Sequence, residues 1–209
     1  YASGANRTWM LAAMEMDVPT NPEPVSLLGS ATQMTAAADH RHLVHEPKRG
    51  LAEGSAIDFL IDTLLAATPH SMTIAMLGPQ TNLALALLRE PQIVQGIKQV
   101  VVMGGAHFNG GNISPVAEFN LFADPHAAEV VLKSGADLVY LPLDVTHKIL
   151  TSEARLEQIA ALNNKAGKLV GDILQACIGG DMARYGIPGG PVHDATVIAY
   201  LLKPALFSG

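Results

Sequence analysis

Polar side chains that could bind a ligand are concentrated in one glycine-rich segment, residues 104–120. Its glycines let the backbone come close to a ligand, and Asn112, Glu118 and Asn120 lie within a few residues of one another. A carboxylate accepts hydrogen bonds from two hydroxyl groups, and an amide both donates and accepts, so these side chains could together hold vicinal hydroxyl groups. The alternative interpretation is a turn whose polar side chains hydrogen-bond to their own backbone.

A second candidate is the pair His193 and Asp194, which directly precedes the last predicted helix. Asp194 could serve only as the N-cap of that helix. It could instead be an oxygen ligand for a hard cation, with His193 beside it as a proton donor. A single carboxylate does not complete a calcium site, which needs about six to eight oxygens.

For two other groups of candidate residues, a role in the fold or at the surface is favoured over a role in binding a ligand. Asp144 follows a predicted strand, where it could cap the next segment or orient a binding loop, and His147 could be a surface residue. Three loop histidines could suggest a metal cluster, but no cysteine or paired acid accompanies them, so solvated side chains are favoured: His40, His42 and His45.

The pattern of elements predicts an α/β fold: an open, mostly parallel sheet with helices on both faces and a Rossmann-like core. Short, wholly apolar strands are expected at 71–77, 100–103 and 138–143. Helices are expected at 6–16, 55–67, 81–88, 124–134, in at least two segments from 151 onward, and at 195–202. Residues 20–54 are expected to form a long loop that contains at most one short helix. Ligands bind beyond the carboxyl ends of such strands, which selects the loops after Leu77, Met103 and Leu143.

The length, composition and charge of the sequence indicate a globular domain and argue against nucleic-acid-binding and membrane-spanning proteins. The 209 residues are 49% hydrophobic with a net charge of −6. This length and hydrophobic content predict a single domain over 1–209, which the pattern of elements makes an α/β domain. Basic residues are scattered, so a nucleic-acid partner is not expected; no apolar run is long enough for a membrane span. Cys177 is the only cysteine, so we expect no intrachain disulfide, a buried thiol and a cytoplasmic location. Both ends of the sequence indicate a piece of a longer protein.

Six ordered segments resemble the inosine-uridine-preferring nucleoside hydrolases. The resemblance runs from about residue 55 to the end, and its most specific part is the Gly111–Asn120 stretch. The segments are Leu77–Asn82, Val101–Gly105, Gly111–Asn120, Asp124–Ala128, Pro142–His147 and His193–Asp194.

The resemblance implies a calcium-dependent enzyme of nucleoside salvage that cleaves the N-glycosidic bond of purine or pyrimidine ribonucleosides, such as inosine and uridine. It implies that Asp194 and the backbone carbonyl of Leu77 bind Ca²⁺ and that His193 protonates the leaving base. The ribose would be bound by Met103, Asn112, Glu118 and Asn120. A homodimer or homotetramer is the expected assembly.

The sequence departs from the family pattern in two places. The aspartate-rich signature D-x-D-P-G-x-D-D, which in the family supplies most of the calcium ligands and the catalytic base, is absent from residues 1–209. The family's His-Gly loop signature is not found between Thr20 and Gly54. Three explanations stay open: a fragment of a complete hydrolase, a catalytically inactive relative that binds nucleoside or ribose, and a structural subunit that pairs with a complete copy.

Overall fold

The computed structural model describes residues 9–11, 53–185 and 189–208. The chain divides into two compact units. In the described residues, the sheet unit comprises 9–11, 53–147 and 193–208, and the helical unit comprises 148–185 and 189–192. His40, His42 and His45 lie outside the described residues, as does the side chain of Cys177.

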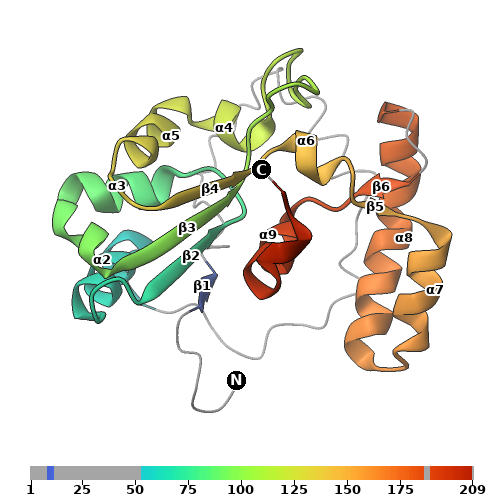
Figure 1. Cartoon of the computed structure of the whole chain (residues 1–209), viewed down its shortest axis with the longest axis horizontal. Helices are drawn as coiled ribbons and strands as arrows, with labels where there is room; N and C mark the ends of the chain where they lie inside the picture. Colours follow the sequence, from blue (N-terminus) through green and yellow to red (C-terminus); the bar gives the residue numbers. More distant parts are fainter. Residues whose placement is uncertain (1–8, 12–52, 186–188, 209) are drawn as a thin grey trace. The chain divides into compact units, whose positions relative to one another are not determined.

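Four parallel strands form the centre of the sheet unit (Figure 1). They are β1 (Trp9–Leu11), β2 (Met72–Met76), β3 (Ile97–Met103) and β4 (Leu138–Leu141), and they lie side by side in that order. Ile74, Val100, Val101 and Val102 are completely buried. Near-continuous apolar runs are typical of parallel strands covered on both faces, so the predicted fold class is confirmed.

Alternate side chains of β3 point to opposite faces of the sheet. Val100 and Val102 pack in a cluster with helix α2 (Ala56–Ala66), helix α3 (Thr81–Arg89), the 3-10 helix η3 (Pro91–Gly96) and helix α5 (Pro125–Leu132). Val101 and Met103 pack on the other face with Val197 of helix α9 (Asp194–Leu202). A short 3-10 helix η4 (Pro204–Leu206) follows α9.

Local sequence signals explain where the helices of this unit begin. The Ser55 hydroxyl caps α2 by accepting from the backbone N–H of Ile57 at 3.1 Å. The Asp124 carboxylate caps α5 through the N–H of Ala127 at 3.0 Å and also accepts from the Thr81 hydroxyl at 2.7 Å. Both features match the usual chemistry of helix N-termini, and both helices lie where the sequence predicts them.

The helix expected over residues 6–16 is wrong in its described part, residues 9–11. Residues 9–11, within the expected helix 6–16, form β1, and Met10 pairs with Ile74 of β2. The rest of 6–16 is outside the described residues. Apolar spacing over a short segment does not distinguish a helix from a buried strand, and pairing with a neighbouring strand then decides the conformation.

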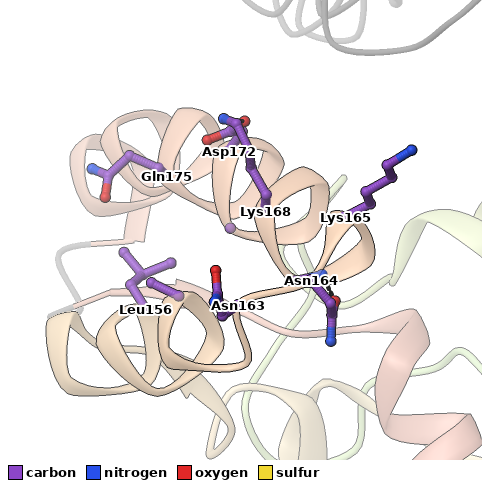
Figure 2. A pocket seen from close by; sticks show the side chains of 10 residues that line it. Leu156, Asn163, Asn164, Lys165, Lys168, Asp172 and Gln175 are labelled. Atoms are coloured by element: carbon purple, nitrogen blue, oxygen red, sulfur yellow. Dashed lines mark hydrogen bonds and ion pairs between the residues drawn. The ribbon is translucent and has the colours of Figure 1, made fainter.

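The helical unit contains a two-stranded antiparallel sheet and two helices. Strand β5 (Leu150–Thr151) pairs with β6 (Gly190–Pro191), and helices α7 (Glu153–Ala161) and α8 (Lys165–Tyr185) follow β5. Gly189 has a φ of +116°, and a Cβ there would lie 2.5 Å from the carbonyl oxygen of Thr151, so the turn into β6 requires glycine. An open groove of about 690 Å³ lies along α7 and α8 (Figure 2). None of the described helices is long and apolar enough to cross a membrane.

Candidate functional site

The candidate residues of the sheet unit meet at the carboxyl ends of β3 and β4. The loop after Met103 leads into helix α4 (Phe119–Ala123), and β4 leads into helix α6 (Leu143–Thr146). Both connections leave the same edge of the parallel sheet (Figure 1). This is the edge at which open α/β sheets bind ligands.

Glu118 holds the glycine-rich loop against the first turn of α4. Its side chain is 2% exposed, and its carboxylate accepts from the backbone N–H groups of Asn120 at 2.8 Å, Leu121 at 3.2 Å and Gly105 at 3.0 Å. A Cβ on Gly104 would lie 2.5 Å from the end of the Leu121 side chain, which shows how closely the loop approaches α4. The alternative interpretation, a turn whose polar side chains hydrogen-bond to the local backbone, therefore applies to this segment, and the Glu118 carboxylate accepts three of these hydrogen bonds.

The other predicted ribose-binding residues are brought to the same place. The Asn120 amide is buried and donates to the Met103 carbonyl oxygen at 3.0 Å and to the Met103 sulfur at 3.4 Å. The side-chain Oδ1 of Asn112 accepts from the backbone N–H of Phe119 at 2.8 Å. These contacts join the end of β3, the loop and α4 into one polar cluster, which we call the amide–carboxylate cluster: Met103, Asn112, Glu118 and Asn120.

Asp144 orients the first part of the same loop. Its carboxylate accepts from three successive backbone N–H groups, those of His107 at 2.8 Å, Phe108 at 2.7 Å and Asn109 at 3.0 Å. Burial is the largest single influence on this carboxyl group and raises its pKa, but the backbone hydrogen bonds together outweigh it, so the pKa lies below the ordinary 3.8. Of the two roles predicted for Asp144, loop orientation is confirmed; Asp144 does not cap α6, because it lies in the first turn and Pro142 occupies the N-cap position without a side-chain hydrogen bond.

Replacing Asp144 by asparagine should loosen this loop and remove its acid sensitivity. Because the pKa is lowered by folding, the carboxylate stabilises the loop above the unfolded value and loses that effect as pH falls through the folded pKa, below 3.8. Asparagine has one acceptor oxygen for three N–H groups, so amide exchange at 107–109 should accelerate roughly 10-fold near neutral pH, as expected for about 1 kcal/mol. Hydrogen exchange, corrected for intrinsic rates at each pH, measures both effects.

A matched control for this experiment is Asp137→Asn, because Asp137 accepts from the Gln99 side chain at 2.8 Å, outside the loop. It should leave exchange at 107–109 unchanged. Equal protection of these three amides in the wild type and in Asp144→Asn would contradict the assigned role.

Asp194 is the first residue of α9 and does not cap it. The N-cap position belongs to His193, whose side chain makes no capping hydrogen bond. The prediction that Asp194 is the N-cap is therefore wrong, because the helix begins one residue earlier than the expected 195–202. The Asp194 side chain is exposed, yet neighbouring protein atoms partly desolvate the carboxyl group and raise its pKa, and the negative charge of Glu118 raises it further.

His193 lies between α6 and α9 and contacts residues of α6. Its Nδ1 is 2.9 Å from the Thr146 hydroxyl oxygen, and its ring centroid is 5.8 Å from that of His147. Burial lowers the pKa of His193 to about 4, and the charge of His147 adds to this effect. The ring is therefore neutral at pH 7, which differs from the histidine acid expected from the sequence. A neutral imidazole has one N–H group, so His193 can donate a hydrogen bond to a ligand from one ring nitrogen only.

The described residues supply only part of a calcium ligand set. Calcium takes about six to eight oxygen ligands. Asp194 offers a carboxylate with no capping duty, and Leu77 follows β2 at the same edge of the sheet. Among the side chains that the structure describes, those of residues 53–175 and 189–208, no group of three or more histidine, cysteine, aspartate or glutamate residues could hold a metal ion. These donors have the right chemistry for calcium, but they are too few to bind it alone.

Thr146 is the residue at this site that sequence reasoning did not identify. It is completely buried beside His193, although the two are 47 positions apart in the chain. A threonine in a short segment after a strand gives no local signal for such a contact. Only the parallel topology, which brings α6 and the start of α9 together, reveals it.

Comparison with known proteins assigns the family. A model of the inosine-uridine preferring nucleoside hydrolase family matches residues 6–209. The chain belongs to this family. An uncharacterized protein of Schizosaccharomyces pombe is 45% identical over 163 residues, covering 78% of this chain and 53% of that protein. A pyrimidine-specific ribonucleoside hydrolase of Escherichia coli is 41% identical over 162 residues, covering 77% and 51%.

Solved structures of the family agree with this assignment. A purine-preferring ribonucleoside hydrolase from Gardnerella vaginalis superposes with a TM-score of 0.72 at 33% identity, over 79% of this chain and 53% of that one. A plant nucleoside hydrolase gives a TM-score of 0.73 at 29% identity, over 78% and 51%. The chain spans about half the length of these family members. The predicted family and its nucleoside-hydrolase-like fold are confirmed.

Proposed function

We propose that the natural protein containing this chain hydrolyses the N-glycosidic bond of purine or pyrimidine ribonucleosides to ribose and free base. The observation that carries the proposal is the position of Asp194. It is an exposed carboxylate without a capping role, and it directly follows His193, whose Nδ1 is 2.9 Å from the Thr146 hydroxyl oxygen in the segment after β4. The hydrolases named above, specific for pyrimidine or preferring purine ribonucleosides, support the same reaction class.

The cluster and His193 have chemistry suited to the two ends of the scissile bond. Cleavage of a glycosidic bond develops positive charge at the anomeric carbon, and carboxylates at the sugar stabilise that charge. Asn112, Glu118 and Asn120 would bind the ribose hydroxyls through their side-chain amide and carboxylate groups. The neutral His193 ring would donate a hydrogen bond to the leaving base, which makes the base a better leaving group.

We propose Ca²⁺ as the cofactor, with Asp194 and the backbone carbonyl of Leu77 among its ligands. When bound, calcium would supply a polarised water for attack on the sugar. Carboxylates and carbonyls are the oxygen donors that calcium prefers, which supports this choice. The remaining ligands would come from other segments of the whole protein. A homodimer or homotetramer and a cytoplasmic location stay predictions from the sequence.

Ribose release by the full-length protein tests this function. We expect inosine or uridine to yield free ribose and base in the presence of Ca²⁺ and little product after chelation, with activity restored by adding calcium back. Calorimetry with inosine and with ribose should run in parallel. Heat of binding without product would instead identify an inactive nucleoside-binding relative. Neither heat nor product would refute both alternatives.

A further inference from the structure

The contact between Thr146 and His193 links the predicted catalytic histidine to a buried hydroxyl group. The Thr146 side chain is fully buried, and its hydroxyl oxygen is 2.9 Å from His193 Nδ1. Both residues belong to the sheet unit. A buried hydroxyl at hydrogen-bond distance from one ring nitrogen restricts both the rotation of the imidazole and the nitrogen that carries its proton.

Thr146 is carried by a segment that is fixed on several sides. The backbone N–H groups of Thr146 and Val145 both donate to the carbonyl oxygen of Pro142, at 3.1 and 2.9 Å. The Leu143 side chain is completely buried in the core, and its N–H donates to the carbonyl oxygen of Gly105 at 2.9 Å. The hydroxyl group therefore has a defined position relative to both the sheet and the glycine-rich loop.

His193 itself is not fixed by the helix that it precedes. Although it occupies the N-cap position of α9, its side chain makes no capping hydrogen bond. An imidazole ring can rotate by 180° about its terminal torsion at low cost, which exchanges the positions of a nitrogen and a carbon. The His147 ring at 5.8 Å limits the available space, but the hydroxyl group distinguishes the two orientations chemically.

We propose that Thr146 is a positioning residue for His193, whose hydroxyl donates to Nδ1 and so keeps the ring proton on Nε2. The Nε2–H group would then donate a hydrogen bond to the leaving base. This inference rests on the proposed function for its catalytic consequence. Its structural part, the position of the proton, is independent of that function. A hydroxyl rotates to suit its partner, so the reverse arrangement, with Nδ1–H donating to the hydroxyl, is the outcome that the experiment must distinguish.

The kinetic part of the test uses the full-length protein with Thr146→Val, which keeps the shape but lacks the hydroxyl, and Thr146→Ser, which retains it. Misplacing a general acid by about 1 Å can cost on the order of 100-fold, so kcat for ribose release should fall about 10- to 100-fold in Thr146→Val with KM nearly unchanged. Thr146→Ser should recover most of kcat. The control is Thr73→Val, because Thr73 is a buried threonine of β2 outside the site; it should leave kcat unchanged.

The spectroscopic part of the test does not depend on catalysis. Long-range ¹H–¹⁵N spectra distinguish a histidine protonated on Nε2 from one protonated on Nδ1. His193, assigned by comparison with His193→Gln, should show the Nε2–H pattern in the wild type and in Thr146→Ser and a mixed pattern in Thr146→Val. An Nδ1–H pattern in the wild type, or an unchanged pattern in Thr146→Val, overturns the inference. If no ribose is released but the spectra behave as expected, the proposed function fails and the positioning of His193 stands.

Discussion

Replacing Asp194 by asparagine should reduce kcat/KM for ribose release by roughly 100-fold or more, as does the loss of one preorganised electrostatic group in other enzymes. The folded protein should not be weakened. Asp194 is exposed and does not cap α9, so no buried hydrogen bond of the helix depends on it. Steady-state kinetics with calcium at several concentrations, and the urea midpoint of unfolding, measure the two effects.

The direction of the stability change follows from the pKa. Partial desolvation and the charge of Glu118 raise the pKa of Asp194 above its ordinary value. For an acid whose pKa is raised by folding, the ionised form is disfavoured in the folded state. The wild type therefore becomes less stable as the pH rises from the unfolded-state pKa of Asp194 through its higher folded-state pKa. Asparagine removes that charge. The urea midpoint of Asp194→Asn at pH 7 should therefore equal or slightly exceed that of the wild type.

Asp124→Ala provides the comparison, because Asp124 has the structural role that Asp194 lacks. Its carboxylate caps α5 and accepts from the Thr81 hydroxyl, and these hydrogen bonds hold its pKa below the ordinary value. We expect a loss of about 1 kcal/mol in unfolding free energy, as when alanine replaces the N-cap residue of other helices, with kcat/KM retained. If Asp194→Asn lost stability but kept its activity, the roles of the two aspartates would be reversed and the proposed site would be wrong.

The sequence predicts the central strands and the longer helices of the sheet unit, where the signals are local. The apolar runs at 71–77 and 100–103 predict buried strands. Ser55 and Asp124 mark the starts of two helices, because their side chains can cap the first turn. The failures are of a different kind. Whether residues 9–11 pair with β2 depends on a strand more than 60 positions away, and propensity cannot decide this.

The candidate site is also predicted only in part, because several of its contacts join residues that are distant in sequence. The sequence selects segments that the fold places at the same edge of the sheet, since Asn112, Glu118, Asn120 and His193 follow or adjoin the carboxyl ends of β3 and β4. It does not reveal that the Glu118 carboxylate accepts from three backbone N–H groups, one of them from Gly105, 13 positions earlier. Nor does it reveal the low pKa of His193, which depends on burial and on His147. These properties arise from packing between loops that are distant in sequence.

Replacing Glu118 by alanine should give the largest stability loss of any single change at this site. The carboxylate is buried and accepts from Gly105, Asn120 and Leu121. Alanine leaves these N–H groups without their acceptor, and each buried group left unsatisfied costs about 1–3 kcal/mol. We therefore expect the free energy of unfolding to fall by about 3 kcal/mol or more, measured by urea unfolding of the full-length protein.

Glu118→Gln separates the charge of this residue from its shape. The glutamine carbonyl oxygen can still accept at one end of the side chain, but its NH₂ group then faces an N–H donor at the other. The loss should be about 1–2 kcal/mol, the cost of one unsatisfied buried donor. The control is Glu129→Gln, which removes only an exposed ion pair with Lys133 and should leave the urea midpoint nearly unchanged.

The activity of the two Glu118 variants then tests whether the carboxylate does more than hold the loop. If Glu118 only positions Gly105 and α4, nucleoside turnover at a temperature where Glu118→Gln is fully folded should approach that of the wild type. If it also binds ribose hydroxyls, KM should rise by roughly 10-fold even in the folded variant, as expected for one lost hydrogen bond to a charged group. We expect the second result, because the Glu118 carboxylate lies beside the Asn120 amide at the carboxyl end of β3, the edge at which sheets of this kind bind ligands.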